Sequence, residues 1–277
     1  WMRVVFSCFV LLTLACGGGP KPVTYSDHAK EAYVSGVTAM SDGNYLDAID
    51  HFTTVKNKYP YSQYAALAEV RIGDTYYEQD KYVEAIGAYR AFTQRRPNHG
   101  EVAYALFRIG ESHYEQQPSK FFLFPPSYEK DKGATRDAVR AYRQYLTRFP
   151  DHEKAGQARK KLATCRAELA DYEMYVAKFY IQQERTRSAL GRLELLHRSF
   201  EDVGDRWRLA SLMLIDAYLV LAKADETGEA PVPDAQEKAA RVAQSIVEKH
   251  PDSAAAKEAR RLLKALGRLQ EPVKTDG

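Results

Sequence analysis

The chain has 277 residues, and 40 Lys and Arg against 37 Asp and Glu give it a formal net charge of +3 at pH 7. Hydrophobic residues make up 45% and charged residues 28%, which is typical of a folded protein. A charge so close to balance argues against a nucleic acid as partner, because such binding requires a concentrated basic face. The length allows one large domain, two ordinary domains or an array of repeats.

The first segment is typical of a bacterial targeting signal. Residues 2–15 carry one positive charge, Arg3, and then an apolar run that is too short to span about 30 Å of hydrocarbon. The run ends in the sequence TLAC at residues 13–16, which resembles a bacterial lipobox, whose cysteine receives a lipid and becomes the first residue after cleavage. We therefore predict that residues 1–15 are a lipoprotein signal peptide and that Cys16 is lipidated.

An ordinary secretory signal with a chance cysteine is the alternative, because a lipobox usually has Leu where this chain has Thr13. The Gly- and Pro-containing stretch after Cys16 favours the lipid, since a tethered domain needs a flexible linker, predicted here at residues 16–27. More than one acyl chain is expected to anchor the protein stably. Gly17 follows the cysteine where Asp would mark inner-membrane retention in the enteric sorting rule, so the outer membrane is favoured.

An internal repeat decides the expected fold. A shift of 37 residues aligns Gly36 with Gly73, Ala48 with Ala85, Phe52 with Tyr89, Val55 with Phe92 and Pro60 with Pro97. A third copy has Gly110 at the same spacing, and its second half fits once 16 extra residues are allowed between its two helices. Gly lets two antiparallel helices approach closely, the ring fills the space opposite, and Pro ends the second helix. This is the pattern of the tetratricopeptide repeat.

Two later copies are more degenerate. The fourth has no helix breaker between Ala158 and Gln182, which predicts an unusually long first helix. The fifth runs from Ile215 to Pro251 with a long loop between its helices, and Asp252–Leu269 is expected to form the polar-faced capping helix that a repeat array needs.

The predicted fold class is therefore all-α, a tetratricopeptide-repeat superhelix of about five helix-turn-helix repeats with a C-terminal capping helix. Repeats 1–3 are assigned to residues 28–150, with an insertion at about 117–134. Repeats 4–5 and the capping helix are assigned to residues 151–269, and residues 270–277 to a disordered tail.

No pattern in the sequence indicates an enzyme, a cofactor or a metal site. The seven His stand in no HExxH or comparable spacing, and neither a GxGxxG after a strand nor a GxxxxGK[ST] is present. His113 is interpreted as a packing or surface residue. Cys165 has no partner cysteine in the body of the chain and is either a small residue at a helix contact or, beside Arg166, an activated thiol.

A peptide-binding groove is expected on the first helix of each repeat, which lines the concave face of a tetratricopeptide superhelix. The groove-facing positions, counted from each Gly, are Tyr33, Val37, Met40, Leu67, Val70, Asp74, Tyr77, Tyr104, Phe107, Glu111 and Tyr114. This face is aromatic, apolar and mildly acidic, which suits an extended peptide with aromatic side chains. The alternative is that half of these rings belong to the core between repeats.

Two further features lie outside this groove. The insertion contains Phe121, Phe122 and Phe124 in the sequence FFLFPP, an exposed apolar patch unless it folds onto the third repeat's own groove or docks another protein; both stay open. The basic turn at Arg185 and Arg187 suits an acidic partner domain, or is a solvated turn.

The lipobox, the five repeats and the segments YLDAIDHFTTVKNKYPYSQYAALA, IGDTYYEQDKYVEAIGAYRAFTQRRP and DYEMYVAKFYIQQ resemble the BamD family of outer-membrane assembly lipoproteins. The similarity runs from Cys16 to at least Asp202, and more loosely to Leu269. It implies a non-catalytic, lipid-anchored subunit of the β-barrel assembly (Bam) machinery on the periplasmic face of the outer membrane. Family members contact nascent outer-membrane proteins through the first three repeats, and the POTRA domain of the central barrel subunit through the C-terminal repeats.

Carried over to this sequence, the groove would receive the substrate, and the region around Arg185, Arg187, Arg192 and Arg198 would face the POTRA domain. Accessory lipoproteins are further candidate partners. The FFLFPP insertion and the long loop of the last repeat are candidate lineage features. The alternatives are another tetratricopeptide envelope lipoprotein, such as a secretin pilotin or a peptidoglycan coordinator, and an adaptor that serves an envelope hydrolase.

Overall fold

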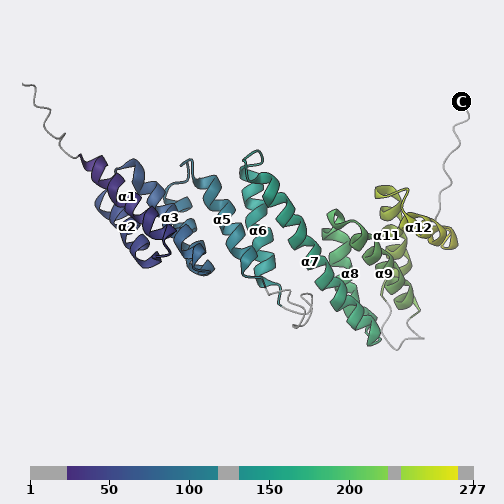
Figure 1. Cartoon of the computed structure of the whole chain (residues 1–277). Coiled ribbons are helices and arrows are strands. Elements are labelled where there is room, and N and C mark those ends of the chain that lie inside the picture. The colour runs from purple at the N-terminus through teal and green to yellow at the C-terminus, as the bar shows by residue number, and fades with distance from the viewer. Residues whose placement is uncertain (1–23, 118–130, 224–231, 268–277) are drawn as a thin grey trace, which may run out of the picture. The chain divides into compact units, whose positions relative to one another are not determined.

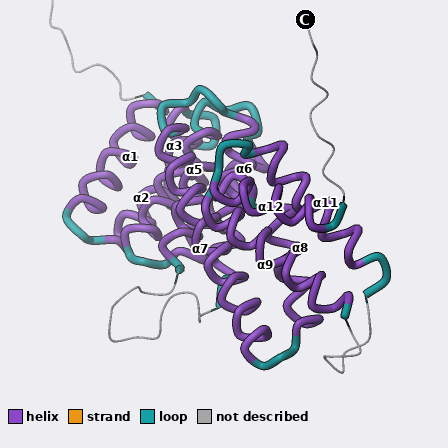
Figure 2. Tube along the Cα trace, turned by 90° about the vertical axis from the view of Figure 1, so that its right-hand side faces the viewer, coloured by secondary structure: helices purple, strands orange, loops and turns teal. Residues whose placement is uncertain are grey.

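The computed structural model describes residues 24–117, 131–223 and 232–267, and within these residues all regular structure is helical (Figures 1 and 2). Cys16 and the three Phe of the insertion lie outside the described residues. The helices are α1 (Tyr25–Ser41), α2 (Tyr45–Lys58), α3 (Gln63–Glu78), α4 (Tyr82–Arg95), α5 (Val102–Glu115), α6 (Gly133–Arg148), α7 (Ala155–Gln182), α8 (Thr186–Ser199), the short 3₁₀ helix η2 (Glu201–Val203), α9 (Asp205–Ala222), α11 (Ala235–Lys249) and α12 (Ala254–Ala265). The chain forms two compact units, Trp1–Ala68 and Glu69–Gly277.

The first unit is built around the antiparallel pair α1 and α2. Helix α1 begins at a capping box, in which the Thr24 hydroxyl accepts the Asp27 N–H at 3.3 Å and the Asp27 carboxylate accepts the Thr24 N–H at 2.9 Å. The chain then reverses at Gly43, whose φ of +77° lies in the left-handed region that glycine adopts without steric cost.

In the second unit the helices follow one another as antiparallel neighbours, and alternate helices also touch, as α5 with α7 and α7 with α9 (Figure 1). Each helix therefore contacts only its near neighbours in the chain, which is how stacked repeats are built. The pairs α5/α6, α7/α8 and α9/α11, followed by α12, confirm the predicted tetratricopeptide-repeat fold. Helix α7 has 28 residues, which confirms the predicted long helix of the fourth repeat.

Close approach of the paired helices explains the glycine of the first three repeats. A Cβ added to Gly36 would lie 2.7 Å from the ring of Phe52, and one added to Gly110 would lie 2.7 Å from the ring of Tyr142. At Gly73 the distance to the ring of Tyr89 would be 2.6 Å. The three rings are completely buried. The structure thus confirms that the glycine makes room for the ring opposite.

The second helix of every repeat ends in the same way. The residues that cap these helices have φ between −126° and −138° and ψ between 28° and 62°; they are Tyr59, Arg96, Phe149, Phe200 and His250. Pro follows four of them, and it disfavours the α conformation in the residue before it. Phe200 is followed by Glu201 instead, and there the chain continues into η2.

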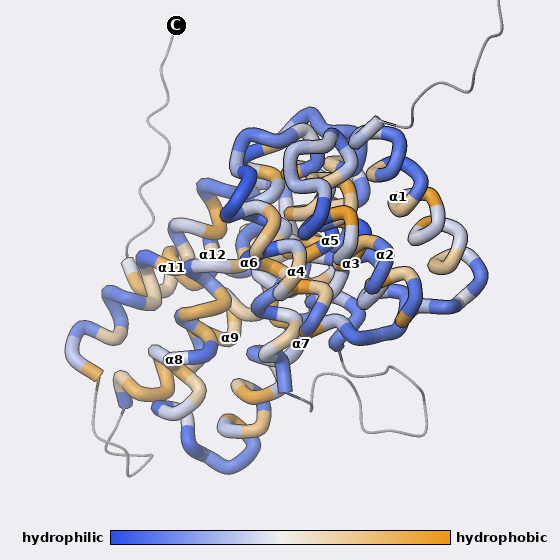
Figure 3. The backbone as a smooth tube through the Cα atoms, turned by 90° about the vertical axis from the view of Figure 1, so that its left-hand side faces the viewer, coloured by the Kyte–Doolittle hydropathy of each residue, from blue (hydrophilic) through white to orange (hydrophobic). Residues whose placement is uncertain are grey.

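Aliphatic side chains dominate the core of the later repeats, together with the rings of Phe200, Trp207 and Tyr218, and α9 presents a long apolar stretch (Figure 3). Leu193 lies 16 residues after Ala177, the same spacing as Phe52 after Gly36, and is fully buried. Trp207 is also fully buried, and its Nε1 donates to the carbonyl of His197 at 2.6 Å. Among the described helices, none has the length and apolar character needed to cross a membrane.

Candidate peptide-binding face

Four of the predicted groove residues lie in the first unit: Tyr33, Val37 and Met40 on α1, and Leu67 at the start of α3. Tyr33 is half-buried, with its ring centroid 5.7 Å from that of Phe52 and 5.4 Å from that of Tyr64. Val37 is 39% exposed, and Met40 and Leu67 are partly exposed. Tyr33 therefore contributes to the packing of α1 as well as to its surface.

The other seven lie in the second unit and separate into two groups. Val70, Asp74, Phe107 and Glu111 are buried, whereas Tyr77, Tyr104 and Tyr114 keep part of their surface exposed. Phe107 packs against Tyr145, with ring centroids 5.7 Å apart, and so belongs to the core between helices. The three tyrosines on α3 and α5 remain the aromatic candidates for contact with a peptide.

Asp74 is the centre of a buried polar network. Its carboxylate accepts hydrogen bonds from the hydroxyl of Tyr89 at 2.5 Å and from that of Tyr104 at 2.8 Å. It also pairs with the guanidinium of Arg71, one turn earlier on α3, at 2.5 Å. Burial and the neighbouring Asp74 raise the pKa of Tyr89 well above its usual range. Asp74 thus ties α3, α4 and α5 together and does not face a groove as predicted.

A guanidinium that was not predicted lies among these tyrosines. Arg108 of α5 stands 3.6 Å from the ring centroid of Tyr77 and donates from Nε to the hydroxyl of Tyr89 at 3.2 Å. Its side chain is 15% exposed, which strengthens the attraction between the cation and the ring. Burial raises the pKa of Tyr77 to about 12, so its phenol stays protonated at neutral pH.

Glu111 on α5 repeats this arrangement one repeat further along the chain. Its buried carboxylate accepts a hydrogen bond from the hydroxyl of Tyr142 and pairs with Nζ of Lys161 on α7 at 2.7 Å. The same ammonium group lies 4.4 Å from the ring centroid of Tyr114. The two acids predicted to face the groove in the second unit, Asp74 and Glu111, are therefore buried and paired. Beside the tyrosines, Arg108 lies 3.8 Å from the exposed Glu78 and Lys161 lies 3.6 Å from the exposed Glu115, so charges of both signs flank the rings.

The arginines predicted to meet a partner domain lie on α8 and at its start. Arg185, Arg187 and Arg198 are exposed, and Arg198 borders shallow depressions between α8 and its neighbours. Arg192 pairs with the buried Glu173 of α7 at 2.8 Å, so it holds two helices together. Of the four, Arg192 has the clearest structural role.

Within the described ranges no group of three or more His, Cys, Asp and Glu side chains is placed to hold a metal ion.

The paired helices, with a glycine on the first and a buried ring opposite it on the second, define a tetratricopeptide-repeat protein. The model of the YfiO family, described as outer membrane lipoprotein, matches residues 26–231. The match covers more than half of the chain, which therefore belongs to this family, as the resemblance to BamD predicted.

Individual relatives agree with this assignment. The chain is 27% identical over 214 residues to the outer membrane protein assembly factor BamD of Caulobacter vibrioides, covering 76% of this chain and 67% of that protein. It is 23% identical over 223 residues to BamD of Vibrio cholerae, covering 79% of this chain and 92% of that protein.

Similar solved structures include a tetratricopeptide repeat protein from Parabacteroides merdae, at 14% identity and a TM-score of 0.34 over 87% of this chain and 74% of that chain. The TPR2AB domain of yeast Sti1 matches at 16% identity and a TM-score of 0.38 over 86% of this chain and 92% of that chain. These scores are low, and the fold is established by the helix pairs themselves.

Proposed function

We propose that this protein is a non-catalytic scaffold subunit of the β-barrel assembly machinery, held at the periplasmic face of the outer membrane. Membership of the outer membrane lipoprotein family supports the location, and the two relatives named as outer membrane protein assembly factors support the process. Repeats 1–3, in residues 28–150, bind segments of nascent outer-membrane proteins. Repeats 4–5, in residues 151–269, bind the POTRA domain of the central barrel subunit.

The observation that carries this proposal is the row of half-exposed tyrosines on α3 and α5 in the second unit. Tyr77 and Tyr114 lie against the partly buried Arg108 and Lys161, and Tyr104 donates to the buried Asp74, so a peptide can pack on these rings at a low cost in side-chain entropy. Arg108 with Glu78, and Lys161 with Glu115, place polar groups of both signs beside the rings, where they can meet the polar groups of an extended segment.

Recovery of the protein from outer membranes tests the proposal as a whole. We expect the chain to purify in a stable complex with a sixteen-stranded barrel protein, and the complex to weaken when the exposed Arg198 is changed to Glu. Recovery with a secretin or with a peptidoglycan enzyme in place of the barrel protein would contradict the proposal.

Replacement of Tyr77 by Ala is expected to weaken binding of a peptide from the C-terminal strand of an outer-membrane barrel by about tenfold, because a large, fixed ring is lost from the face. Fluorescence anisotropy with a labelled peptide measures the affinity, and circular dichroism checks that the helical signal is unchanged. Tyr61→Ala is the matched control, since Tyr61 is 95% exposed and lies between α2 and α3. Undiminished affinity of the Tyr77 variant would count against this face.

Cys16 is proposed to carry the lipid anchor. Replacement of Cys16 by Ala removes the only sulfur at the predicted cleavage site and should move the protein from the membrane fraction to the soluble periplasmic fraction. Detergent partitioning followed by immunoblotting measures this, with Cys8→Ala as the control that should leave the distribution unchanged. A Cys16 variant that stays in the membrane fraction would refute the anchor.

A further inference from the structure

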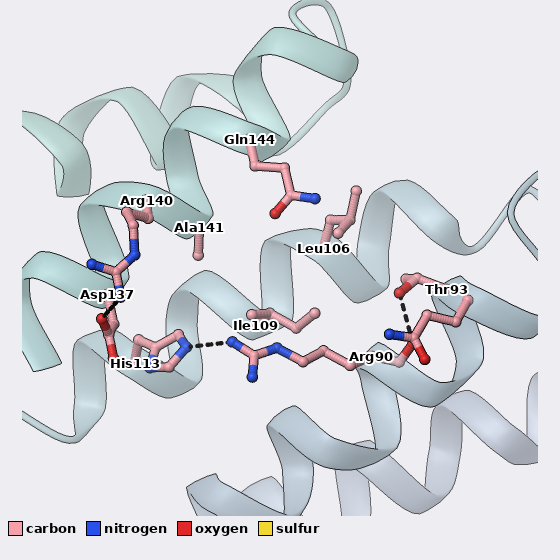
Figure 4. Close-up of a pocket in the computed structure, with 10 residues that line it drawn as sticks. Arg90, Thr93, Leu106, Ile109, His113, Asp137, Arg140, Ala141 and Gln144 are labelled. Carbon is pink, nitrogen blue, oxygen red and sulfur yellow. Dashed lines mark hydrogen bonds and ion pairs between the residues drawn. The ribbon is translucent and has the colours of Figure 1, made fainter.

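A pocket of about 390 Å³ opens in the second unit between α4, α5 and α6 (Figure 4). Its volume falls in the range of sites that hold small ligands or a few residues of a peptide. Leu106 and Ile109 of α5 and Ala141 of α6 form an apolar base, and polar side chains of α4 and α6 surround it.

This pocket is separate from the surface that carries Tyr77, Tyr104 and Tyr114, called here the tyrosine face. At 100° per residue, Leu106, Ile109 and His113 lie on roughly the opposite side of α5 from Tyr104 and the other α5 positions of the predicted groove. A ligand in the pocket would therefore leave the tyrosine face free.

The walls of the pocket carry two guanidinium groups, of Arg90 and Arg140, and the carboxylate of Asp137. Among the described residues no carboxylate lies within ion-pair distance of Arg90, whose guanidinium instead meets Nε2 of His113 at 3.4 Å, which is long for a hydrogen bond. On the other wall Arg140 is already paired with Asp137 of its own helix. His113 is only 8% exposed, and burial lowers its pKa, so the ring is neutral at pH 7. Two guanidinium groups thus face a single carboxylate.

The repeat register suggests how this space could be filled. His113 stands 37 residues after Tyr76, the matching position of the second repeat. The smaller imidazole in the third repeat leaves room that a phenol ring would occupy. The sequence therefore supplies a substitution, His113→Tyr, that should fill the pocket with a side chain already used at this position.

We propose that this pocket binds a carboxylate side chain of an acidic peptide segment from a partner protein, with Arg90 as its main ion-pair partner. The apolar base accepts the aliphatic part of such a side chain, and the amides of Gln94 and Gln144 on opposite walls can bond to its backbone. Asp137 disfavours a phosphate more than a carboxylate, because a phosphate carries more negative charge.

The test uses the mature chain and two capped peptides, Ac-Ala-Leu-Glu-Leu-Ala-NH₂ and its Gln isostere. Isothermal titration calorimetry should show that the Glu peptide binds at least about tenfold more tightly than the Gln peptide, because only the carboxylate pairs with a guanidinium. Arg90→Gln should remove this preference, and His113→Tyr should abolish binding. Arg140→Gln should have a smaller effect, since Arg140 already has Asp137.

Arg143→Gln is the matched control, because Arg143 is exposed on α6 and does not line the pocket. NMR adds a second readout: a bound carboxylate should raise the pKa of His113, whose imidazole faces Arg90 on α4 and Asp137 and Arg140 on α6. Equal affinity for the two peptides, an unchanged preference in Arg90→Gln, or full competition by inorganic phosphate would each overturn the proposal.

Discussion

Replacement of Asp74 by Ala is expected to lower the free energy of unfolding by about 3–5 kcal/mol, the range found when one member of a buried charged network is removed. Asp74 is 3% exposed and accepts the hydroxyls of Tyr89 and Tyr104 besides pairing with Arg71. Its loss leaves these donors and the half-buried Arg108 without their shared acceptor. The cost is therefore much larger than that of a surface carboxylate.

Urea unfolding monitored by circular dichroism measures this loss. Asp50→Ala is the control, since Asp50 is exposed on α2, and it should change the stability by less than about 0.5 kcal/mol. The first repeat suggests a further variant, because Val37 and Phe52 stand there where the second repeat has Asp74 and Tyr89. Asp74→Val combined with Tyr89→Phe should be more stable than Asp74→Val alone. A single Asp74→Ala variant that loses under about 1 kcal/mol would contradict the network.

Replacement of two glycines of the second unit by Ala should change the stability of the protein in opposite directions. Gly73→Ala is expected to destabilise the protein by about 1–3 kcal/mol, because the new methyl group meets the fully buried ring of Tyr89, which is also held by its hydroxyl. Gly87 lies inside α4, and a Cβ added there would have no atom within 4 Å, so Gly87→Ala should stabilise the helix by about 0.5–1 kcal/mol.

Thermal and urea unfolding of both variants provide the measurement, and Gly110→Ala should behave like Gly73→Ala because its methyl would meet Tyr142. If the Gly73 and Gly87 variants shift the stability in the same direction, the contact between Gly73 and Tyr89 does not limit how closely α3 and α4 approach.

The features that the sequence predicted correctly depend on fixed spacings within one repeat. The contact between Gly73 and Tyr89, the helix ends before Pro and the length of α7 follow from helix periodicity and from the residue types alone. No partner in another repeat has to be known for any of them.

The orientation of Asp74 and Glu111 could not be derived in this way. Each follows the repeat's glycine, at the border between the helix face that packs and the face that is exposed, so its direction depends on the ring opposite. The sequence did contain a signal for this contact. The residue after the glycine and the ring of the second helix change together: Val is found with Phe in the first repeat, and an acid with Tyr in the second and third. The roles of Arg108 and Lys161 were not predicted, because each lies one repeat after the acid that it contacts.

The same cross-repeat pairs bear on how the protein unfolds. Asp74 of the second repeat, which pairs with Arg71 of its own repeat, also lies 3.7 Å from Arg108 of the third, and Glu111 of the third pairs with Lys161 of the fourth. In a one-dimensional repeat array such contacts add to the coupling between neighbours and penalise states in which one repeat melts alone. Repeats two to four should therefore unfold as one cooperative block, and a chain shortened just before α7 would expose Glu111 as an uncompensated charge.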